Sequence, residues 1–143
     1  MGGRVDLTLT PERVLADYPK TKGRQVLWGG RILESRNLAD STELTILAFP
    51  IDNAGIPQTG NDIMIGRFIL VQAGYLETID YAPGREITVY GQVAGSREAV
   101  LGETRIQQPV LTALQIHLWR PALAGQLPWW SGIHLGFGIS GGF

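Results

Sequence analysis

The chain has no cysteine among its 143 residues. This absence excludes thiol catalysis, cysteine-ligated zinc and internal disulfides. Histidine is nearly as scarce, because only His117 and His134 occur and neither has a further histidine at ligand spacing. A zinc site needs three or four ligands. We therefore expect no metal and no cofactor.

Charged residues are also few, at 17% of the chain, and 12 basic side chains face 13 acidic ones. A net charge of -1 gives no attraction to phosphate backbones, so nucleic acid is not an expected partner. No run of 18 apolar residues suggests a membrane-spanning helix. Hydrophobic residues nevertheless make up 44% of the chain, so we expect some apolar surface to face a partner or a lipid surface.

Turns and short strands dominate the remaining pattern. Glycine-arginine pairs precede β-branched and aromatic stretches at Gly23, Gly66 and Gly84. Strands are expected over residues 25–35, 42–49, 67–72, 86–94, 103–106 and 110–119. Thr10 and Pro11 open one short helix that should end near Tyr18.

These elements predict a mainly β fold. The favoured architecture is a small OB-like, closed or partly closed antiparallel β-barrel of five to six strands with one short N-terminal helix. Gly29 and Gly30 lie inside the first strand, where they indicate a bulge, a sharp bend or the close approach of another backbone. A two-sheet sandwich remains the alternative.

The chain divides into three parts. Residues 1–9 are expected to be an N-terminal linker or the remnant of a trimmed start, and residues 10–120 form the barrel. Residues 121–143 form a tail rich in glycine and aromatic residues, with no charged side chain after Arg120. Pro121, Pro128 and the frequent glycines exclude a helix there.

No cluster of residues indicates a reaction. A Ser-His-Asp site lacks the nucleophile elbow that such sites need, and no phosphate-binding glycine loop follows a strand. The acids of the two long connections, such as Asp52 and Asp80, are better explained as solvated turn residues. We expect no catalytic residues and no enzyme activity.

The candidate ligand-binding residues are two aromatics and three arginines: Trp28, Arg31, Arg67, Tyr75 and Arg85. The arginines could converge on one rim of the barrel as an anion-binding cluster. Alternatively, each fixes a strand end by pairing with a neighbouring acid, for instance Arg67 with Asp52. The structural role is favoured.

The tail supplies a second set of candidates, which are Trp129, Trp130, Phe137 and Phe143. Aromatic side chains of this kind tend to lie at a membrane interface, so they are candidates for membrane or partner contact. The alternative, which we favour, is that the tail folds over the barrel mouth or packs in an oligomer.

An ordered series of segments resembles a known family. The segments include Trp28-Gly29-Gly30-Arg31-Ile32, Phe49-Pro50-Ile51-Asp52, Gly66-Arg67-Phe68, Tyr81-Ala82-Pro83-Gly84-Arg85, Gln108-Pro109-Val110 and Leu118-Trp119. Between Gly23 and Trp119 the chain resembles the Slp family of Gram-negative outer-membrane lipoproteins.

The resemblance implies a cellular location more than a biochemical activity. Members are acylated on a cysteine at the signal-peptide cleavage site, and some are induced by starvation or stationary phase. We expect that cysteine to lie upstream of Met1, with a linker near Gly2 to Asp6 and the folded domain facing the periplasm. The implied function is non-enzymatic binding or scaffolding at the outer membrane, with an envelope protein or a second copy as partner. The alternative is an OB-like barrel that binds a small ligand or an oligosaccharide.

Overall fold

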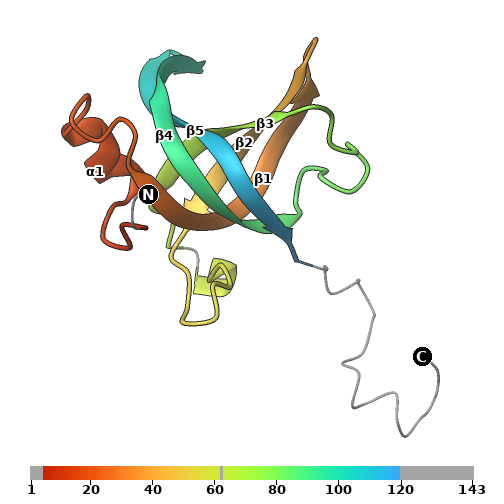
Figure 1. Cartoon of the computed structure of the whole chain (residues 1–143), viewed down its shortest axis with the longest axis horizontal. Helices are drawn as coiled ribbons and strands as arrows, with labels where there is room; N and C mark the ends of the chain where they lie inside the picture. Colours follow the sequence, from red (N-terminus) through yellow and green to blue (C-terminus); the bar gives the residue numbers. More distant parts are fainter. Residues whose placement is uncertain (1–4, 62, 120–143) are drawn as a thin grey trace, which may run out of the picture.

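Five β-strands form a closed barrel with one short α-helix on its N-terminal side (Figure 1). The computed structural model describes residues 5–61 and 63–119. Its elements are α1 (Pro11–Ala16), β1 (Gln25–Asn37), β2 (Ser41–Phe49), the 3-10 helix η1 (Thr59–Asn61), β3 (Gly66–Ala73), β4 (Glu86–Leu101) and β5 (Thr104–Leu118). Within these ranges, no helix has the length and hydrophobicity needed to cross a membrane.

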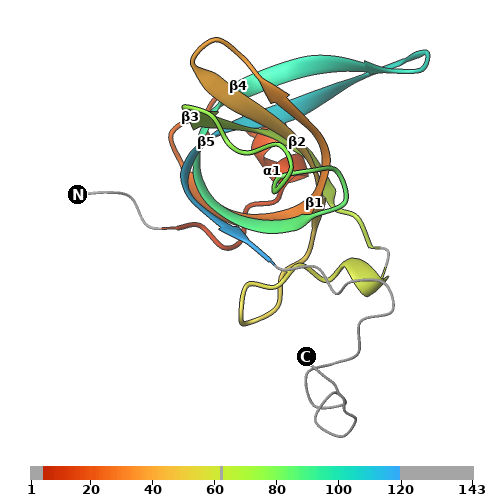
Figure 2. The ribbon, with the colours of Figure 1, turned by 90° about the vertical axis from the view of Figure 1, so that its right-hand side faces the viewer.

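The strand order around the barrel is β1-β2-β3-β5-β4 (Figure 2). Four of the neighbouring pairs are antiparallel, but β3 and β5 run parallel where the barrel closes. The prediction of a mainly β, closed barrel with one short N-terminal helix is confirmed, and the sandwich is excluded. The parallel closure is a departure from a purely antiparallel barrel.

The last two strands are longer than the sequence pattern predicts. That pattern predicts separate strands over residues 103–106 and 110–119, yet β5 runs without interruption from Thr104 to Leu118. β5 is paired with β4 along its whole length, and this pairing keeps β5 continuous at Pro109. β3 pairs with β5 only from Val110 onward. The missing N–H of Pro109 therefore interrupts no hydrogen bonds between β5 and β3.

The bend in β1 lets the strand pair with both of its neighbours. Gly29 and Gly30 are in register with β2 on one side and with β4 on the other. A Cβ atom on Gly30 would lie 2.1 Å from the carbonyl oxygen of Leu47. Close approach of another backbone is therefore the reason for glycine here, and a bulge between Ile32 and Glu34 follows it.

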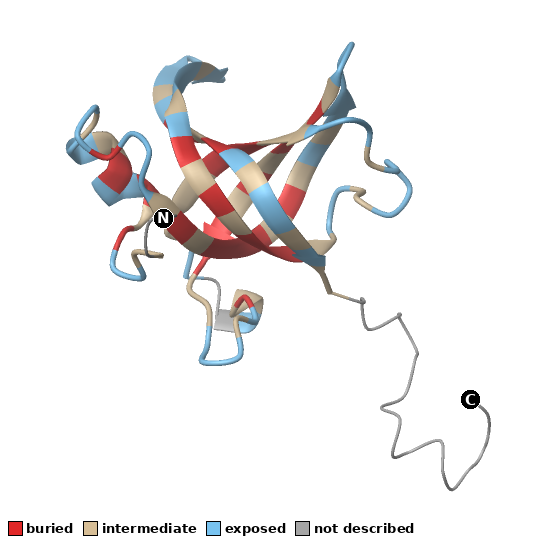
Figure 3. Ribbon diagram, viewed as in Figure 1, coloured by how far each residue is buried: buried red, intermediate tan, exposed pale blue. Residues whose placement is uncertain are grey.

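Buried residues alternate with more exposed ones along the strands (Figure 3). Along β2, every second residue from Thr42 to Ala48 is buried, as expected for a strand with one face toward a core. The largest fully buried side chains are Phe68, Ile32, Leu44, Ile46, Leu70, Ile87 and Leu111. This interior leaves binding to the outer surface and to the ends of the barrel.

The helix α1 packs against β3 and β5. Thr10 caps it by accepting a hydrogen bond from the amide of Arg13 at 3.2 Å, and Pro11 occupies the first turn. It ends at Ala16, two residues before the predicted end. Val14 is fully buried, so the helix contributes to the core and closes the barrel where β3 and β5 part.

Residues 5–9 lie against the barrel. Val5 forms a parallel bridge with Gln25, and the amide of Asp6 donates to the carbonyl of Gln25 at 2.7 Å. The carboxylate of Asp6 also pairs with Arg24 at 2.5 Å. Leu9 belongs to the core at 8% exposure. The chain is thus fixed to β1 before the helix begins.

Candidate binding site

An apolar groove lies between the N-terminal segment, β1 and the loop that follows β2. We call it the N-terminal groove; its volume is about 560 Å³. Its lining is Leu7, Leu9, Thr10, Leu27, Trp28, Gly29, Phe49, Pro50, Ile51, Asp52, Asn53, Gly55 and Ile65. Such a concave, mainly apolar site with a few polar groups is typical of small-molecule and peptide binding.

Hydrogen bonds shape the loop that forms one wall of the groove. The carboxylate of Asp52 accepts from the amides of Ala54 and Ile56 at 2.8 and 2.9 Å. The hydroxyl of Thr88 on β4 donates to the carbonyl of Gly55. Ile51 pairs with Pro57, and the wall is therefore preformed. Asp52 acts as a turn residue, as expected.

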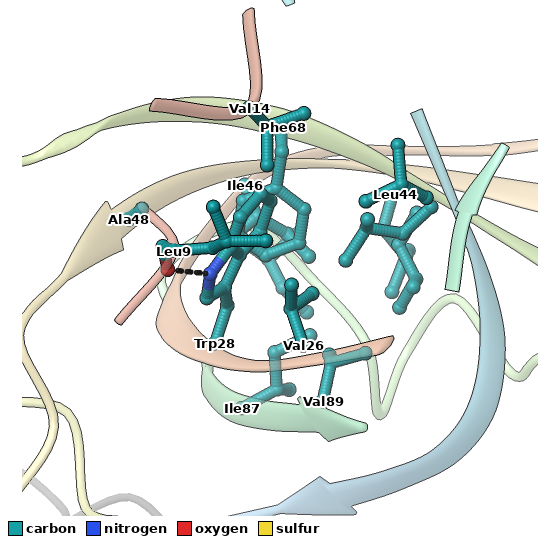
Figure 4. Close-up of a cluster of buried hydrophobic side chains, with 14 residues drawn as sticks. Leu9, Val14, Val26, Trp28, Leu44, Ile46, Ala48, Phe68, Ile87 and Val89 are labelled. Atoms are coloured by element: carbon teal, nitrogen blue, oxygen red, sulfur yellow. Dashed lines mark hydrogen bonds between the residues drawn. The ribbon is translucent and has the colours of Figure 1, made fainter. Parts of the chain in front are cut away.

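Trp28 lies at the floor of the groove but points into the barrel (Figure 4). Its indole N–H donates to the carbonyl of Leu9 at 2.8 Å, and its ring meets Phe68 edge to face at 5.0 Å. Only 4% of the residue is exposed. Trp28 is thus an anchor between the core and the N-terminal segment, with little ring surface left for a ligand.

Arg31 and Arg67 lie in one row across the outer face of the barrel, with Leu47 between them. The guanidinium of Arg31 lies over the ring of Phe49, 5.4 Å from its centre. That distance suits a cation–π interaction. Arg67 lines a second pocket beside α1 and does not line the N-terminal groove. The predicted pair with Asp52 is not formed within the described ranges.

Arg85 and Tyr75 hold loops in place. The Arg85 guanidinium donates to the carbonyls of Asp80 and Trp119 at 2.8 and 3.2 Å, which fastens the loop before β4 to the end of β5. The Tyr75 hydroxyl donates to the carbonyl of Ala39 at 2.6 Å, although the residue is 65% exposed. Arg31 and Arg67 share one row on the barrel face, but the other ligand candidates lie elsewhere, so the five do not form one site.

Sequence reasoning missed a polar relay on the outside of β4. The indole N–H of Trp119 donates to the hydroxyl of Thr88 at 2.9 Å, and that hydroxyl donates to Gly55. His117 packs edge to face on Trp119, with 4.1 Å between ring centres. The only available signal was the outward position of Thr88 in the strand alternation, which does not reveal a partner 33 residues away.

An ion pair with two hydrogen bonds to Arg97 is formed by Glu43 on β2, and it serves the fold. Glu43 accepts two hydrogen bonds from Arg97 at 2.9 and 3.0 Å and one from Arg36 at 3.3 Å. The hydrogen bonds from Arg97 are the main reason that the pKa of the Glu43 carboxyl lies below its usual value. This contact ties the long β4–β5 hairpin to β2.

No group of three or more metal-ligating side chains occurs in the described part of the chain. The tail candidates Trp129, Trp130, Phe137 and Phe143 lie outside the described residues, as does His134.

Comparison with known proteins gives a family. The model of a family described as "Outer membrane lipoprotein Slp family" matches residues 2–132. An uncharacterized protein of Haemophilus influenzae (strain ATCC 51907 / DSM 11121 / KW20 / Rd) is 28% identical over 96 residues, which are 67% of this chain and 52% of the relative. The chain thus spans about half the length of that relative.

A solved structure described as an aspartyl-tRNA synthetase from Leishmania major Friedlin aligns with 82% of this chain and 23% of its own. The TM-score is 0.45 at 15% identity. At that score the likeness carries no argument about fold or function.

Proposed function

The chain belongs to the Slp family of outer-membrane lipoproteins, and from this premise we propose that it is a non-enzymatic binding or scaffolding domain of the Gram-negative envelope. The proposal includes an N-terminal lipid anchor, a domain that faces the periplasm, and a link to starvation or stress. The lipid anchor is supported by membership of a family of outer-membrane lipoproteins.

We propose that the side of the barrel that carries the N-terminal groove faces the membrane. The chain enters the barrel at Val5, beside the groove, and a lipid attached upstream would bring this side toward the bilayer. The loop between β2 and β3 and the end of β5 lie together at the lower end of the barrel in Figures 1 and 2. The tips of the β1–β2 and β4–β5 hairpins point the other way in Figure 1.

One observation carries the proposal. Leu7 is 72% exposed, although the backbone on both sides of it is fixed by the Val5–Gln25 bridge and by the buried Leu9. Ile56, at 37% exposure, projects from the loop that forms the opposite wall of the groove. Apolar side chains held open on a rigid edge are suited to enter the interface of a lipid bilayer. We propose that the bilayer interface is what this edge contacts.

Vesicle sedimentation tests the contact. Leu7→Asp should lower the fraction of protein that sediments with phosphatidylethanolamine/phosphatidylglycerol vesicles severalfold, because a carboxylate opposes insertion. Val100→Asp is the matched control, since Val100 is 65% exposed at the tip of the β4–β5 hairpin. Equal loss in both variants, or no loss in either, would refute the proposed orientation.

The tail provides a separate arm of the same assay. A chain ending at Arg120 lacks Trp129, Trp130, Phe137 and Phe143, which are proposed to contact membrane or partner. Reduced sedimentation of the shortened chain supports a membrane role for these residues. Unchanged sedimentation contradicts that role and favours contact with the barrel or a second copy.

We propose no nucleic-acid partner, and retention of DNA on a filter at low salt would contradict this.

We also propose that the barrel is OB-like. This description is supported by five strands in a closed barrel with β3 beside β5, and OB-like barrels bind oligosaccharides and oligonucleotides with strand faces and loops. A small-ligand role is favoured by one observation, the position of the polar Asp52 and Asn53 in an otherwise mainly apolar groove lining. Tryptophan fluorescence that stays constant during titration with oligosaccharides would count against that role.

A further inference from the structure

Arg67 shares with Arg85 a buried Nε atom without a hydrogen-bond partner, but within the described residues it lacks the hydrogen bonds that the two terminal nitrogens of Arg85 form. Arg24 and Arg97 pair with acids, and Arg85 binds two backbone carbonyls. The Nε atom of Arg67 is buried without a hydrogen-bond partner, and within residues 5–61 and 63–119 its guanidinium forms no ion pair. A buried donor without a partner costs free energy, and such groups in native proteins call for an explanation.

The side chain of Arg67 lines a pocket of about 510 Å³ between α1, the residues before β3 and the start of β5. The pocket follows from the topology. β3 and β5 are paired only from Ile69 with Val110 to Val71 with Thr112, and the strands part below this register. The helix α1 covers the gap but does not fill it. A pocket of this volume is within the range of small-molecule sites.

The rest of the lining is mainly aliphatic. Its apolar members are Pro11, Leu15, Met64, Ile65 and Ile106. Met64 is 56% exposed and the adjoining Ile63 is 57% exposed, which leaves apolar surface open at the edge of the pocket. A cation that has no ion pair within the described ranges and lies beside an aliphatic wall is complementary to a molecule with an anionic head and a hydrocarbon chain.

We propose that this pocket binds a small amphiphile with a carboxylate head group, which Arg67 holds by a charge-assisted hydrogen bond while the aliphatic wall covers the chain. The carboxylate is favoured over a bulkier head because the guanidinium is partly buried and its planar fork matches a carboxylate. Glu12 lines the same pocket, and its charge opposes the ligand. Glu12→Gln should therefore strengthen binding.

Calorimetric titration of the full chain with decanoate tests the proposal, with decanol as the neutral probe of equal length. Decanoate should bind at least about 10-fold more tightly than decanol, as expected for one hydrogen bond to a charged group. Equal affinities for the two probes would overturn the proposal. A second arm with phosphatidylglycerol vesicles distinguishes a free amphiphile from a membrane headgroup as the source of the anion.

Arg67→Met should weaken decanoate binding by about 10-fold or more and leave decanol binding unchanged. Arg13→Met is the matched control, because Arg13 lies in α1, is exposed and does not line the pocket. If Arg67→Met fails to fold, Met64→Glu answers the same question from an exposed position, since it places a negative charge at the edge of the pocket.

Unchanged decanoate affinity in either folded variant would refute the assignment. The pocket adjoins the N-terminal groove through Thr10 and Ile65, but Leu7 does not line it, so Leu7→Asp should leave decanoate affinity unchanged. The two proposals therefore fail separately.

Discussion

Replacing Gly30 with alanine tests how the barrel closes. The new Cβ would lie 2.1 Å from the carbonyl oxygen of Leu47, whereas ordinary van der Waals contact begins at 3.4 Å, so about 1.3 Å of separation is missing (3.4 − 2.1). The backbone of Leu47 cannot shift easily, because Leu47 is paired with Arg31 of β1 on one side and with Arg67 of β3 on the other. Overpacking against such a backbone costs about 3 kcal/mol or more.

The other glycines give a graded comparison. A Cβ on Gly29 would meet the side chains of Ile51 at 2.7 Å and Pro57 at 2.9 Å, and a loop can shift more easily than a paired strand. Gly29→Ala should therefore cost only about 1–2 kcal/mol. Gly60 has no atom within 4 Å of the added carbon, so Gly60→Ala should change stability by less than about 0.5 kcal/mol.

Urea denaturation and thermal denaturation, both followed by circular dichroism, measure the stability of all three variants. We expect the order of destabilisation Gly30, Gly29, Gly60, with a fall of roughly 10 °C in melting temperature for Gly30→Ala. A Gly30→Ala protein as stable as the wild type would refute the claim that close strand approach shapes the barrel.

Three further predictions concern polar contacts. Thr42→Val should cost about 1–3 kcal/mol in urea denaturation and speed hydrogen exchange of the Leu76 amide, because the fully buried hydroxyl accepts that amide at 2.9 Å. The pKa of Glu43 is lowered from 4.5 by Arg97, so its contribution to stability is complete above pH 4.5 and is lost as pH falls through the lower folded-state pKa. Glu43→Gln should therefore flatten the acid side of the stability profile, by about 0.5–1 kcal/mol because Arg97 is 43% exposed, and an unchanged profile would contradict this. Trp28→Phe removes the donor to a backbone carbonyl 2.8 Å away and should cost about 1–3 kcal/mol of unfolding free energy; no loss would show that this bond is dispensable.

Local patterns predicted most of the elements. Strand-forming residues between glycine turns located the five strands, although β5 was predicted as two separate pieces, and Thr10 and Pro11 located the helix. The Gly29-Gly30 pair indicated a bulge, a sharp bend or close backbone approach, and the last of these is found at Gly30. The family resemblance drawn from ordered motifs is confirmed by the match over residues 2–132.

Long-range pairing could not be predicted in the same way. Whether Arg31, Arg67 and Arg85 converge depends on strand register and on loop partners, and neither leaves a periodic signal. The continuity of β5 through Pro109 depends on its pairing with β4. The docking of residues 5–9 depends on the bridge at Val5, on the contacts of Asp6 with Gln25 and Arg24, and on the burial of Leu9, in a segment too short to show any pattern.

The most direct test of the proposed function uses the absence of cysteine, because a single introduced cysteine can carry a fluorophore without competing sites. Labels at position 7, beside the groove, and at position 100, on the far hairpin, are compared in lipid-anchored protein on vesicles that contain brominated lipids. Stronger quenching at position 7 is the predicted result. Equal quenching at both positions, or stronger quenching at position 100, would contradict the claim that the N-terminal groove faces the membrane.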